Sequence, residues 1–208
     1  MRLVVMASGN GTDLQSIIDA IEKGYIKAEI VGVISDKKEA YALERAKKHG
    51  IPAYCLPKKE LKDRFFKKLL SILEKLDPDG IILAGFLTIL SEEIVERFPN
   101  KIINIHPSLI PAFCGKGFYG MKVHQAVYDY GVKYTGCTVH FVDKGADTGP
   151  IILQEVVKIE DEDTPETIAK KVLEVEHRVL PYAVKLFVEG KLKVEGRKVK
   201  ILDREAMM

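Results

Sequence analysis

Asn104 and His106 form the residue pair best suited to catalysis in this sequence. They stand at the end of a short apolar run, 101–105, that has the composition of a strand. Side chains two apart on a strand point to the same side. An amide N–H can hold a carbonyl oxygen while an imidazole handles a proton, which suits transfer of an acyl or formyl group. A purely structural histidine at a strand end is the competing interpretation, and these residues alone leave both open.

A glycine-containing loop, Ser8 to Asp13, follows the first apolar run and precedes a helical pattern. Glycines let the backbone approach an anion, and the next helix offers free N–H groups and its positive dipole end. The glycines stand at positions 9 and 11 only, so the loop is neither a P-loop nor a dinucleotide-binding fingerprint. The loop therefore indicates either a phosphate site or a plain turn in which Thr12 or Asp13 caps the helix.

A third polar loop runs from Asp143 to Pro150 and contains a second acid, Asp147. Acids in turns commonly accept hydrogen bonds from their own backbone. A carboxylate that instead reaches His106 would orient the ring, stabilise the imidazolium form and raise its pKa. The sequence leaves both roles open for Asp147. His140, in the middle of an expected strand, faces either this site or the core.

Short β-branched runs alternate with helical patterns in the first half of the chain. Nearly continuous apolar strands in repeated βα units predict a parallel, doubly wound sheet with right-handed crossovers. We expect an α/β fold with a mostly parallel sheet in a single domain, 1–208. Its parts would be a phosphate-binding half, 1–107, a catalytic half, 108–192, and a tail, 193–208. The expected strands are 3–7, 29–34, 53–56, 80–84, 101–105, 134–142, 151–157, 192–194 and 198–201, and the expected helices are 13–23, 39–49, 61–76, 91–97, 123–130 and 164–188.

Composition narrows the class of protein. Thirty-two basic and thirty acidic residues leave a net charge of +2, which argues against nucleic-acid binding through bulk charge. Three cysteines without C-x-x-C spacing favour a reducing compartment over a disulfide framework or a zinc site, with Cys114 expected to be the most exposed. The longest apolar stretch, 81–90, is too short to span a bilayer. We expect a soluble cytoplasmic protein without metal, nucleic-acid or membrane partners, and a homodimer stays open.

Four segments together resemble the phosphoribosylglycinamide formyltransferase family, folate-dependent enzymes of purine biosynthesis. The segments are Ser8–Gln15, Leu83–Leu90, Ile103–Pro111 and Gly136–Pro150. They occur in the family's order, and the similarity extends from residue 1 to about 192. The N-I-H-P-S-L segment with the later D-x-G-P turn is specific to folate formyltransferases as a group. The G-N-G loop and the short chain favour the glycinamide ribonucleotide enzymes within that group.

The resemblance implies a role for each residue at a matching position. It implies a Rossmann-like formyltransferase fold, 10-formyltetrahydrofolate as the formyl donor and no metal. The implied catalytic triad is Asn104, His106 and Asp147. The implied ribonucleotide-binding residues are Gly11, Thr12, Asp13, Pro107 and Glu176. The implied folate-binding residues are Arg64, Leu87, Thr88, Ile89, Leu90, Asn104, Asp143, Lys144, Gly145 and Ala146.

Two positions depart from the family pattern. Asp13 stands where the family usually has asparagine, and we expect it to add a negative charge beside the substrate phosphate at a partly solvated site. Thr88 stands where arginine is common. Because the family uses mainly backbone at that segment, we expect folate binding to survive.

Three other functions are compatible with parts of this sequence. Formyltetrahydrofolate hydrolases usually carry an extra N-terminal regulatory domain, and methionyl-tRNA formyltransferases usually carry a C-terminal barrel domain. We expect neither domain here, because strand-like sequence begins at residue 3 and fewer than 25 residues follow the last long helix. A non-enzymatic nucleotide-binding module that uses only the glycine loop leaves the three implied catalytic residues unexplained.

Overall fold

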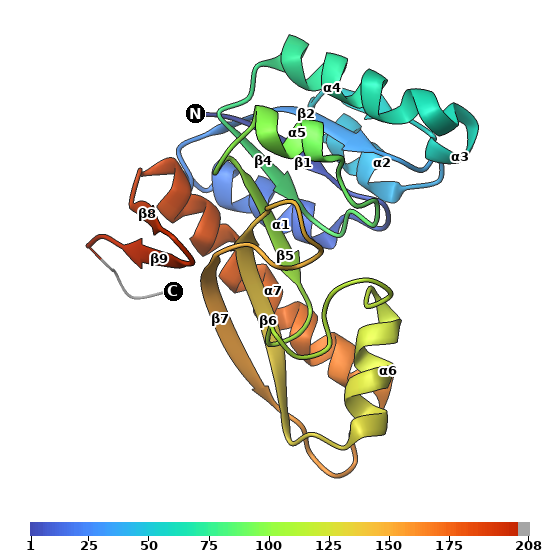
Figure 1. Cartoon of the computed structure of the whole chain (residues 1–208), viewed down its shortest axis with the longest axis vertical. Helices are drawn as coiled ribbons and strands as arrows, with labels where there is room; N and C mark the ends of the chain where they lie inside the picture. The colour runs from blue at the N-terminus through green and yellow to red at the C-terminus, as the bar shows by residue number, and fades with distance from the viewer. Residues whose placement is uncertain (204–208) are drawn as a thin grey trace. The chain divides into compact units, whose positions relative to one another are not determined.

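The apolar runs of the first half form neighbouring parallel strands (Figure 1). The computed structural model describes residues 1–203. In it the strands lie in the order β3-β2-β1-β4-β5. Apart from those of β3, their residues are almost all buried, which explains why the runs are continuously apolar rather than alternating. The strands are β1 (Arg2–Met6), β2 (Glu29–Ser35), β3 (Ala53–Cys55), β4 (Gly80–Leu83) and β5 (Ile102–His106).

The strand order places the helices on both faces of this sheet. Successive strands run outward from β1 in one direction to β3 and in the other to β5. Right-handed crossovers therefore put α1 and α2 on one face and α4 and α5 on the other. The loops after β1 and β4 flank the switch point, where ligands of such sheets bind. The helical segments are α1 (Thr12–Glu22), α2 (Tyr41–Lys48), α3 (Lys58–Leu61), η1 (Lys62–Arg64), α4 (Phe65–Leu76) and α5 (Glu92–Arg97).

The second half is built around an antiparallel strand pair and a long helix. Strand β7 is antiparallel to β6 and parallel to β9, and β8 forms a hairpin with β9. Helix α7 packs on β6 and β7 and also contacts α6. Its start is fixed by a capping box between Thr164 and Thr167, with Pro165 in the first turn. The elements are α6 (Met121–Tyr130), β6 (Tyr134–Phe141), β7 (Ile151–Lys158), α7 (Pro165–Val188), β8 (Leu192–Glu195) and β9 (Lys198–Ile201).

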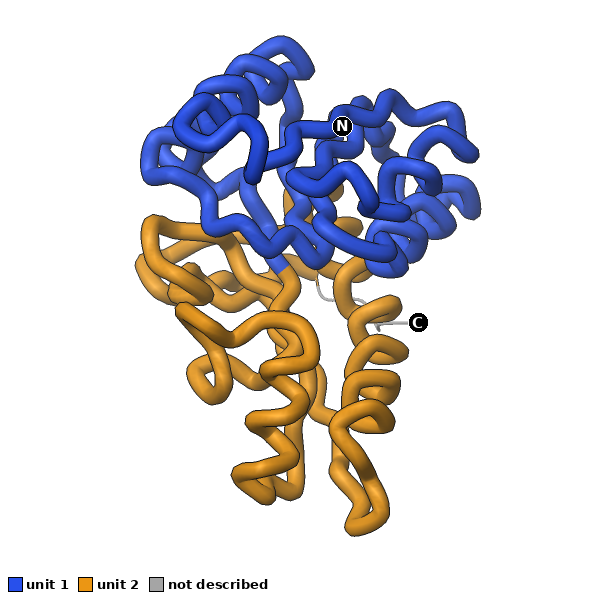
Figure 2. Tube along the Cα trace, turned by 90° about the vertical axis from the view of Figure 1, so that its right-hand side faces the viewer, with its two compact units in different colours: residues 1–104 blue, residues 105–208 orange. Residues whose placement is uncertain are grey.

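The predicted mixed α/β fold with a mostly parallel sheet is confirmed, and most elements begin and end within a residue or two of their expected bounds. The exception is the expected helix 61–76. It is preceded by a short helix and a 3-10 turn, with Lys62 at φ 48 at the break. The chain divides into two compact units, Met1–Asn104 and Ile105–Met208, which Figure 2 colours separately. The C-terminal part of the expected tail, 204–208, lies outside the described residues.

Helix α1 buries a carboxyl group. Asp13 is only 8% exposed, and this burial raises the pKa of its carboxyl group from 3.8 to about 7. The sequence-based expectation of a partly solvated charge is wrong, because the first turn of α1 is packed inside the unit. Near neutral pH the folded protein therefore holds this carboxyl group protonated in a substantial fraction of molecules.

Replacing Asp13 by Asn should remove a pH-dependent cost of folding. The folded state binds the proton more tightly than the unfolded chain, so wild-type stability falls as pH rises from about 4 to about 7. At pH 8 we expect Asp13→Asn to unfold at a higher denaturant concentration than the wild type. Its free energy of unfolding should be larger by on the order of 2–4 kcal/mol. The gain should largely vanish at pH 4. Chemical denaturation at both pH values measures this, and an equal effect at both would refute the assignment.

Candidate functional site

One buried carboxylate joins the loops that follow β1, β2 and β4. Asp36, just after β2, accepts hydrogen bonds from the hydroxyls of Ser8, at 2.6 Å, and Thr88, at 2.7 Å. The Ser8 hydroxyl in turn accepts a hydrogen bond from the Leu87 N–H at 2.8 Å. All three polar side chains are buried. The glycine loop and the 87–90 segment are thereby held together at the switch point, and Thr88, which departs from the family pattern, is part of the link.

The glycine loop has the geometry of an anion-binding turn. Gly11 has φ 78 and is the residue that caps α1, where no side chain accepts a hydrogen bond from the first turn. A Cβ at Gly11 would lie 2.8 Å from the Cα of Ala42, so no larger residue fits. Thr12 and Asp13 therefore do not cap the helix, contrary to the simpler interpretation of this loop. The first N–H groups of a helix have no acceptor within the helix itself, so this end of α1 suits an anion.

Arg45 of α2 holds this loop in place through hydrogen bonds to Asn10. Its Nε donates to the Asn10 carbonyl at 2.7 Å and its Nη2 to the Asn10 side-chain oxygen at 2.6 Å. Its Nη1 donates to Gln15 at 3.2 Å, and its guanidinium lies 5.0 Å from the centre of the Tyr41 ring. Arg45 was not predicted from the sequence, because it stands 35 positions from Asn10 in an ordinary amphipathic helix. It adds a fixed positive charge next to the glycine loop.

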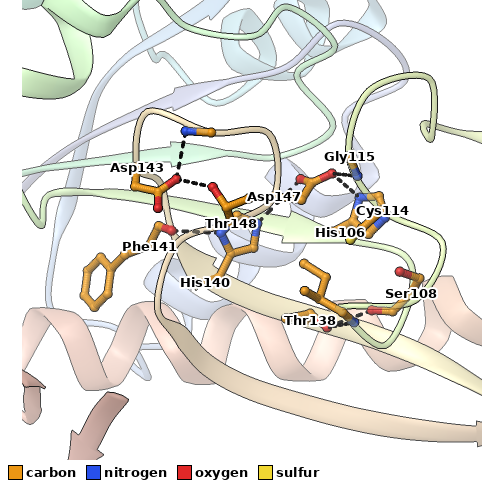
Figure 3. A network of polar contacts seen from close by, with 12 residues as sticks. His106, Ser108, Cys114, Gly115, Thr138, His140, Phe141, Asp143, Asp147 and Thr148 are labelled. Carbon is orange, nitrogen blue, oxygen red and sulfur yellow. Dashed lines mark hydrogen bonds and ion pairs between the residues drawn. The ribbon is translucent and has the colours of Figure 1, made fainter. Parts of the chain in front are cut away.

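In the second unit the carboxylate of Asp147 lies between two imidazole rings (Figure 3). His106 Nδ1 is 3.5 Å from Asp147 Oδ2, and His140 Nε2 is 3.7 Å from Oδ1. The Gly115 N–H donates to Oδ2 at 2.9 Å. Of the two roles left open, Asp147 takes the pairing one. His140 faces the site, a role that its position in the middle of a strand did not decide.

Asp143 takes the other role, because it stabilises its own turn. One of its oxygens accepts hydrogen bonds from the Gly145 N–H at 3.0 Å and the Thr148 hydroxyl at 2.5 Å (Figure 3). The two acids of one loop thus have different structural roles. Asp143 shapes the turn, and Asp147 leaves it to reach the histidines.

Both histidines are oriented by backbone carbonyl groups. His106 Nε2 lies 2.9 Å from the Phe113 oxygen, and His140 Nδ1 lies 2.8 Å from the Phe141 oxygen. A carbonyl oxygen only accepts, so these nitrogens carry the proton in each neutral ring. The other nitrogen of each ring, Nδ1 of His106 and Nε2 of His140, faces Asp147. A proton added to either ring would therefore point at the carboxylate.

Burial outweighs the carboxylate in setting the charge of His106. The residue is 5% exposed, and loss of solvent lowers its pKa more than the charge of Asp147 raises it. The expected rise in the His106 pKa is thus wrong. Burial acts to raise the pKa of Asp147, but the contacts with His140 and His106 and the Gly115 N–H together lower it. At neutral pH the site contains an ionised carboxylate beside a mostly neutral His106.

Thr138 on β6 pins the loop that covers His106. Its hydroxyl donates to the Ser108 carbonyl at 2.7 Å and accepts from the Ile110 N–H at 3.1 Å. The Ser108 hydroxyl donates to the Ala112 carbonyl at 2.7 Å, so the loop closes on itself before Phe113. Figure 3 shows Thr138 and Ser108 below His106. The position of the Phe113 oxygen thus follows from strand β6.

The remaining predicted residues fall in both units. Asn104 is half-buried on β5, two positions before His106, and Pro107 follows directly. Glu176 is buried in α7, whereas Arg64 is exposed at the end of η1. In the 87–90 segment the alternate side chains of Leu87 and Ile89 are exposed, and those of Thr88 and Leu90 are buried. In the Asp143 turn, Lys144 and Gly145 are exposed and Ala146 is half-buried.

All three cysteines are free thiols, but Cys55 is the exposed one and Cys114 is half-buried, which corrects the expectation for Cys114. Burial and the charge of Asp147 raise the Cys114 pKa, so the thiol is not activated as a nucleophile. Within residues 1–203, no group of three or more His, Cys, Asp or Glu side chains could hold a metal ion. No helix in the same range is long and apolar enough to cross a bilayer.

Comparison with known proteins places this geometry in a family. Residues 1–184 match the formyl transferase family. A phosphoribosylglycinamide formyltransferase of Haemophilus influenzae is 38% identical over 99% of this chain and 95% of its own length. The chloroplastic enzyme of that name from Arabidopsis thaliana is 39% identical over 92% of this chain and 67% of its own length. The chain spans 62–67% of the plant relatives and 15–19% of the animal trifunctional purine biosynthetic proteins.

Solved structures agree with the sequence relatives. The crystal structure of glycinamide ribonucleotide transformylase 1 from Symbiobacterium toebii is 42% identical, with a TM-score of 0.91 over 98% of this chain and 94% of that one. A formyltetrahydrofolate deformylase from Pseudomonas syringae shares the fold at 28% identity, with a TM-score of 0.89 over 97% of this chain and 66% of that one. With its sheet, its His106–Asp147 pair and these matches, the chain belongs to the formyl transferase family.

Proposed function

We propose that this chain transfers the formyl group of 10-formyltetrahydrofolate to the primary amine of glycinamide ribonucleotide, a step of purine biosynthesis. The observation that carries the proposal is the pairing of His106, at the end of β5, with Asp147. The chain also covers 90–95% of the length of two bacterial relatives that are named phosphoribosylglycinamide formyltransferase. The proposed reaction takes place in the cytoplasm and uses no metal.

The transfer requires one proton to move between two nitrogens. The substrate amine attacks the formyl carbon, a C–N bond forms, and the carbonyl electron pair moves to oxygen. The amine nitrogen then carries a positive charge and must lose a proton. When the carbonyl re-forms, the bond to the folate N10 breaks, and that nitrogen must gain one. A single group that accepts and then donates a proton serves both steps.

His106 is the proposed proton carrier. Its pKa is lowered, so the ring is mostly neutral and able to accept a proton at neutral pH. We infer that the substrate displaces the Phe113 carbonyl from Nε2. The ring then changes tautomer by exchange with solvent, losing the proton on Nε2 and gaining one on Nδ1, where it donates to Asp147. The Nε2 lone pair takes the amine proton, and the ionised Asp147 stabilises the resulting imidazolium until it protonates N10.

Asn104 is the proposed donor to the oxyanion. It precedes His106 by two positions on β5, so both side chains leave the same face of the strand. Its amide N–H is neutral and does not titrate, so it can stabilise negative charge on the formyl oxygen throughout the reaction. The ring of His106 would act on the two nitrogens that exchange the proton, and the amide of Asn104 would act on the formyl oxygen.

The first unit supplies the proposed phosphate subsite. Backbone N–H groups of Gly11, Thr12 and Asp13, the dipole of α1 and the charge of Arg45 favour a phosphate there. We propose that Pro107 and Glu176 contact the ribonucleotide, Glu176 at the ribose. The proposed folate contacts are Arg64, Leu87, Thr88, Ile89, Leu90, Asn104, Asp143, Lys144, Gly145 and Ala146.

An acceptor comparison tests the function directly. Consumption of 10-formyltetrahydrofolate is followed by absorbance with glycinamide ribonucleotide, with methionyl-tRNA, and with water as the only acceptor. We expect turnover only with the ribonucleotide. An equal rate without any amine acceptor would mean that the chain is a hydrolase, and preference for the tRNA would also refute the proposal.

Removing the proton carrier or its partner should change turnover in distinguishable ways. We expect Asn104→Ala and His106→Ala each to lose roughly 10²–10³ in kcat, with small changes in both KM values. Wild-type kcat should fall on the acid side as His106 becomes protonated, at a pH below the ordinary histidine pKa. Asp147→Asn removes the one charge that raises that pKa, so its acid limb should move to still lower pH while kcat drops.

Matched pH profiles of the wild type, His106→Ala and Asp147→Asn provide the measurement. Asn tolerates the left-handed backbone of residue 147, which has φ 57, so Asp147→Asn should remain folded. A folded His106→Ala protein with near-normal turnover would show that another group carries the proton.

Arg45 should affect ribonucleotide binding and not the chemical step. Arg45→Ala leaves the Asn10 carbonyl and side chain without their charged donor, so we expect the KM for glycinamide ribonucleotide to rise about tenfold. The folate KM and kcat should change less than about twofold. Lys47→Ala is the matched control, because Lys47 lies on the same helix and pairs with Glu44. An unchanged ribonucleotide KM in Arg45→Ala would exclude this role.

A further inference from the structure

The C-terminal hairpin contacts the turn that carries Asp147. Arg197 lies between β8 and β9, and its Nη1 donates to the Thr148 carbonyl at 2.5 Å. Thr148 is the residue after Asp147. Next to this contact, Lys198 of β9 pairs with Ile151 at the start of β7. The hairpin thus touches the turn through a side chain and is joined to the strand that follows it.

The conformation of Asp147 needs support from its surroundings. Its φ of 57 lies in the left-handed region, which Asp adopts more readily than most residues but which neighbouring contacts still help to hold. On one side, Asp143 binds the Gly145 N–H and the Thr148 hydroxyl. On the other, Gly149 is packed so closely that a Cβ there would overlap the Phe141 carbonyl oxygen. These contacts fix both flanks of the turn.

The peptide between Thr148 and Gly149 lies between these flanks. A rotation of this peptide is coupled through the backbone of Thr148 to the peptide that follows Asp147, and through it to the direction of the Asp147 carboxylate. That carboxylate must reach Nδ1 of His106 at 3.5 Å and Nε2 of His140 at 3.7 Å at the same time. A charged donor on the Thr148 oxygen restrains the rotation.

We propose that Arg197 is a positioning residue for the catalytic turn, and that the β8–β9 hairpin aims the Asp147 carboxylate at His106. The inference rests on the proposed function only for its effect on turnover. It gives a role to a segment of the chain that carries no recognised motif. The hairpin is placed by main-chain pairing with β7, so its arginine arrives at the turn in a fixed position.

The test compares Arg197→Ala, Arg197→Lys and a control in two backgrounds, wild type and Asp147→Asn. Loss of one charge-assisted hydrogen bond corresponds to roughly a threefold to tenfold fall in kcat, with both KM values nearly unchanged. Arg197→Lys should recover part of the loss. In the Asp147→Asn background Arg197→Ala should cause no further loss, because the group that it positions is gone. Lys193→Ala is the control, since Lys193 lies on β8 and pairs with Glu195.

A second readout does not depend on the reaction. The titration of His106 is followed by NMR of the ring protons in each variant. In this structure Asp147, His140 and His124 are the titratable groups that act with His106, and the Phe113 carbonyl is its hydrogen-bond acceptor. Arg197→Ala should lower the His106 pKa in the same direction as Asp147→Asn, because the carboxylate moves away.

The outcomes are separable. If the wild type transfers no formyl group to the ribonucleotide, the proposed function fails while the NMR titration still decides the role of Arg197. If Arg197→Ala leaves both kcat and the His106 titration at wild-type values, the positioning role is wrong. An equal loss of kcat in both backgrounds would also overturn it, since the effect would then not pass through Asp147. Should Arg197→Ala unfold, Arg197→Lys carries the same comparison.

Discussion

The organisation of the candidate site in the second unit depends on one carboxylate that faces two imidazole rings. Each ring already donates one N–H to a backbone carbonyl, so its second nitrogen must face Asp147. Burial makes an extra positive charge costly, whereas the ionised carboxylate makes it tolerable. The balance leaves His106 neutral but ready to accept a proton. Burial alone would favour the neutral ring, and the carboxylate alone would favour the protonated ring.

Several elements must agree for this arrangement to form. His106 comes from the end of β5, His140 from β6, and Asp147 from the turn between β6 and β7. The loop after His106 returns to place the Phe113 oxygen on the ring, and Thr138 of β6 fixes that loop. In the other unit the same logic recurs, because Asp36 and Arg45 hold loops whose backbone does the proposed binding. Side chains that anchor loops thus shape both candidate sites.

Periodicity and local chemistry predicted the elements and part of the site. Continuous apolar runs identified the parallel strands, and the spacing of Asn104 and His106 placed both at one strand end. Asp36 and Arg45 were missed, because each depends on a partner far away in the sequence. The role of His140 was left open, because its position in a strand does not say which face of that strand turns toward Asp147. The direction of the His106 pKa was predicted wrongly for a different reason: pairing with Asp147 can be guessed from residue types, but the depth of burial cannot. The split between Asp143 and Asp147 likewise required the folded turn.

The ring tautomers of His106 and His140 test the central claim most directly. Nitrogen-15 shifts of the four ring nitrogens, measured without substrate above the histidine pKa values, distinguish a protonated nitrogen from a bare one. This structure predicts that neutral His106 carries its proton on Nε2 and neutral His140 on Nδ1, with the bare nitrogens toward Asp147. In Asp147→Asn the side-chain amide can donate to a bare nitrogen, and these tautomers should persist. A neutral His106 that carries its proton on Nδ1 in the free enzyme would contradict the account, because the Phe113 carbonyl would then not hold the ring.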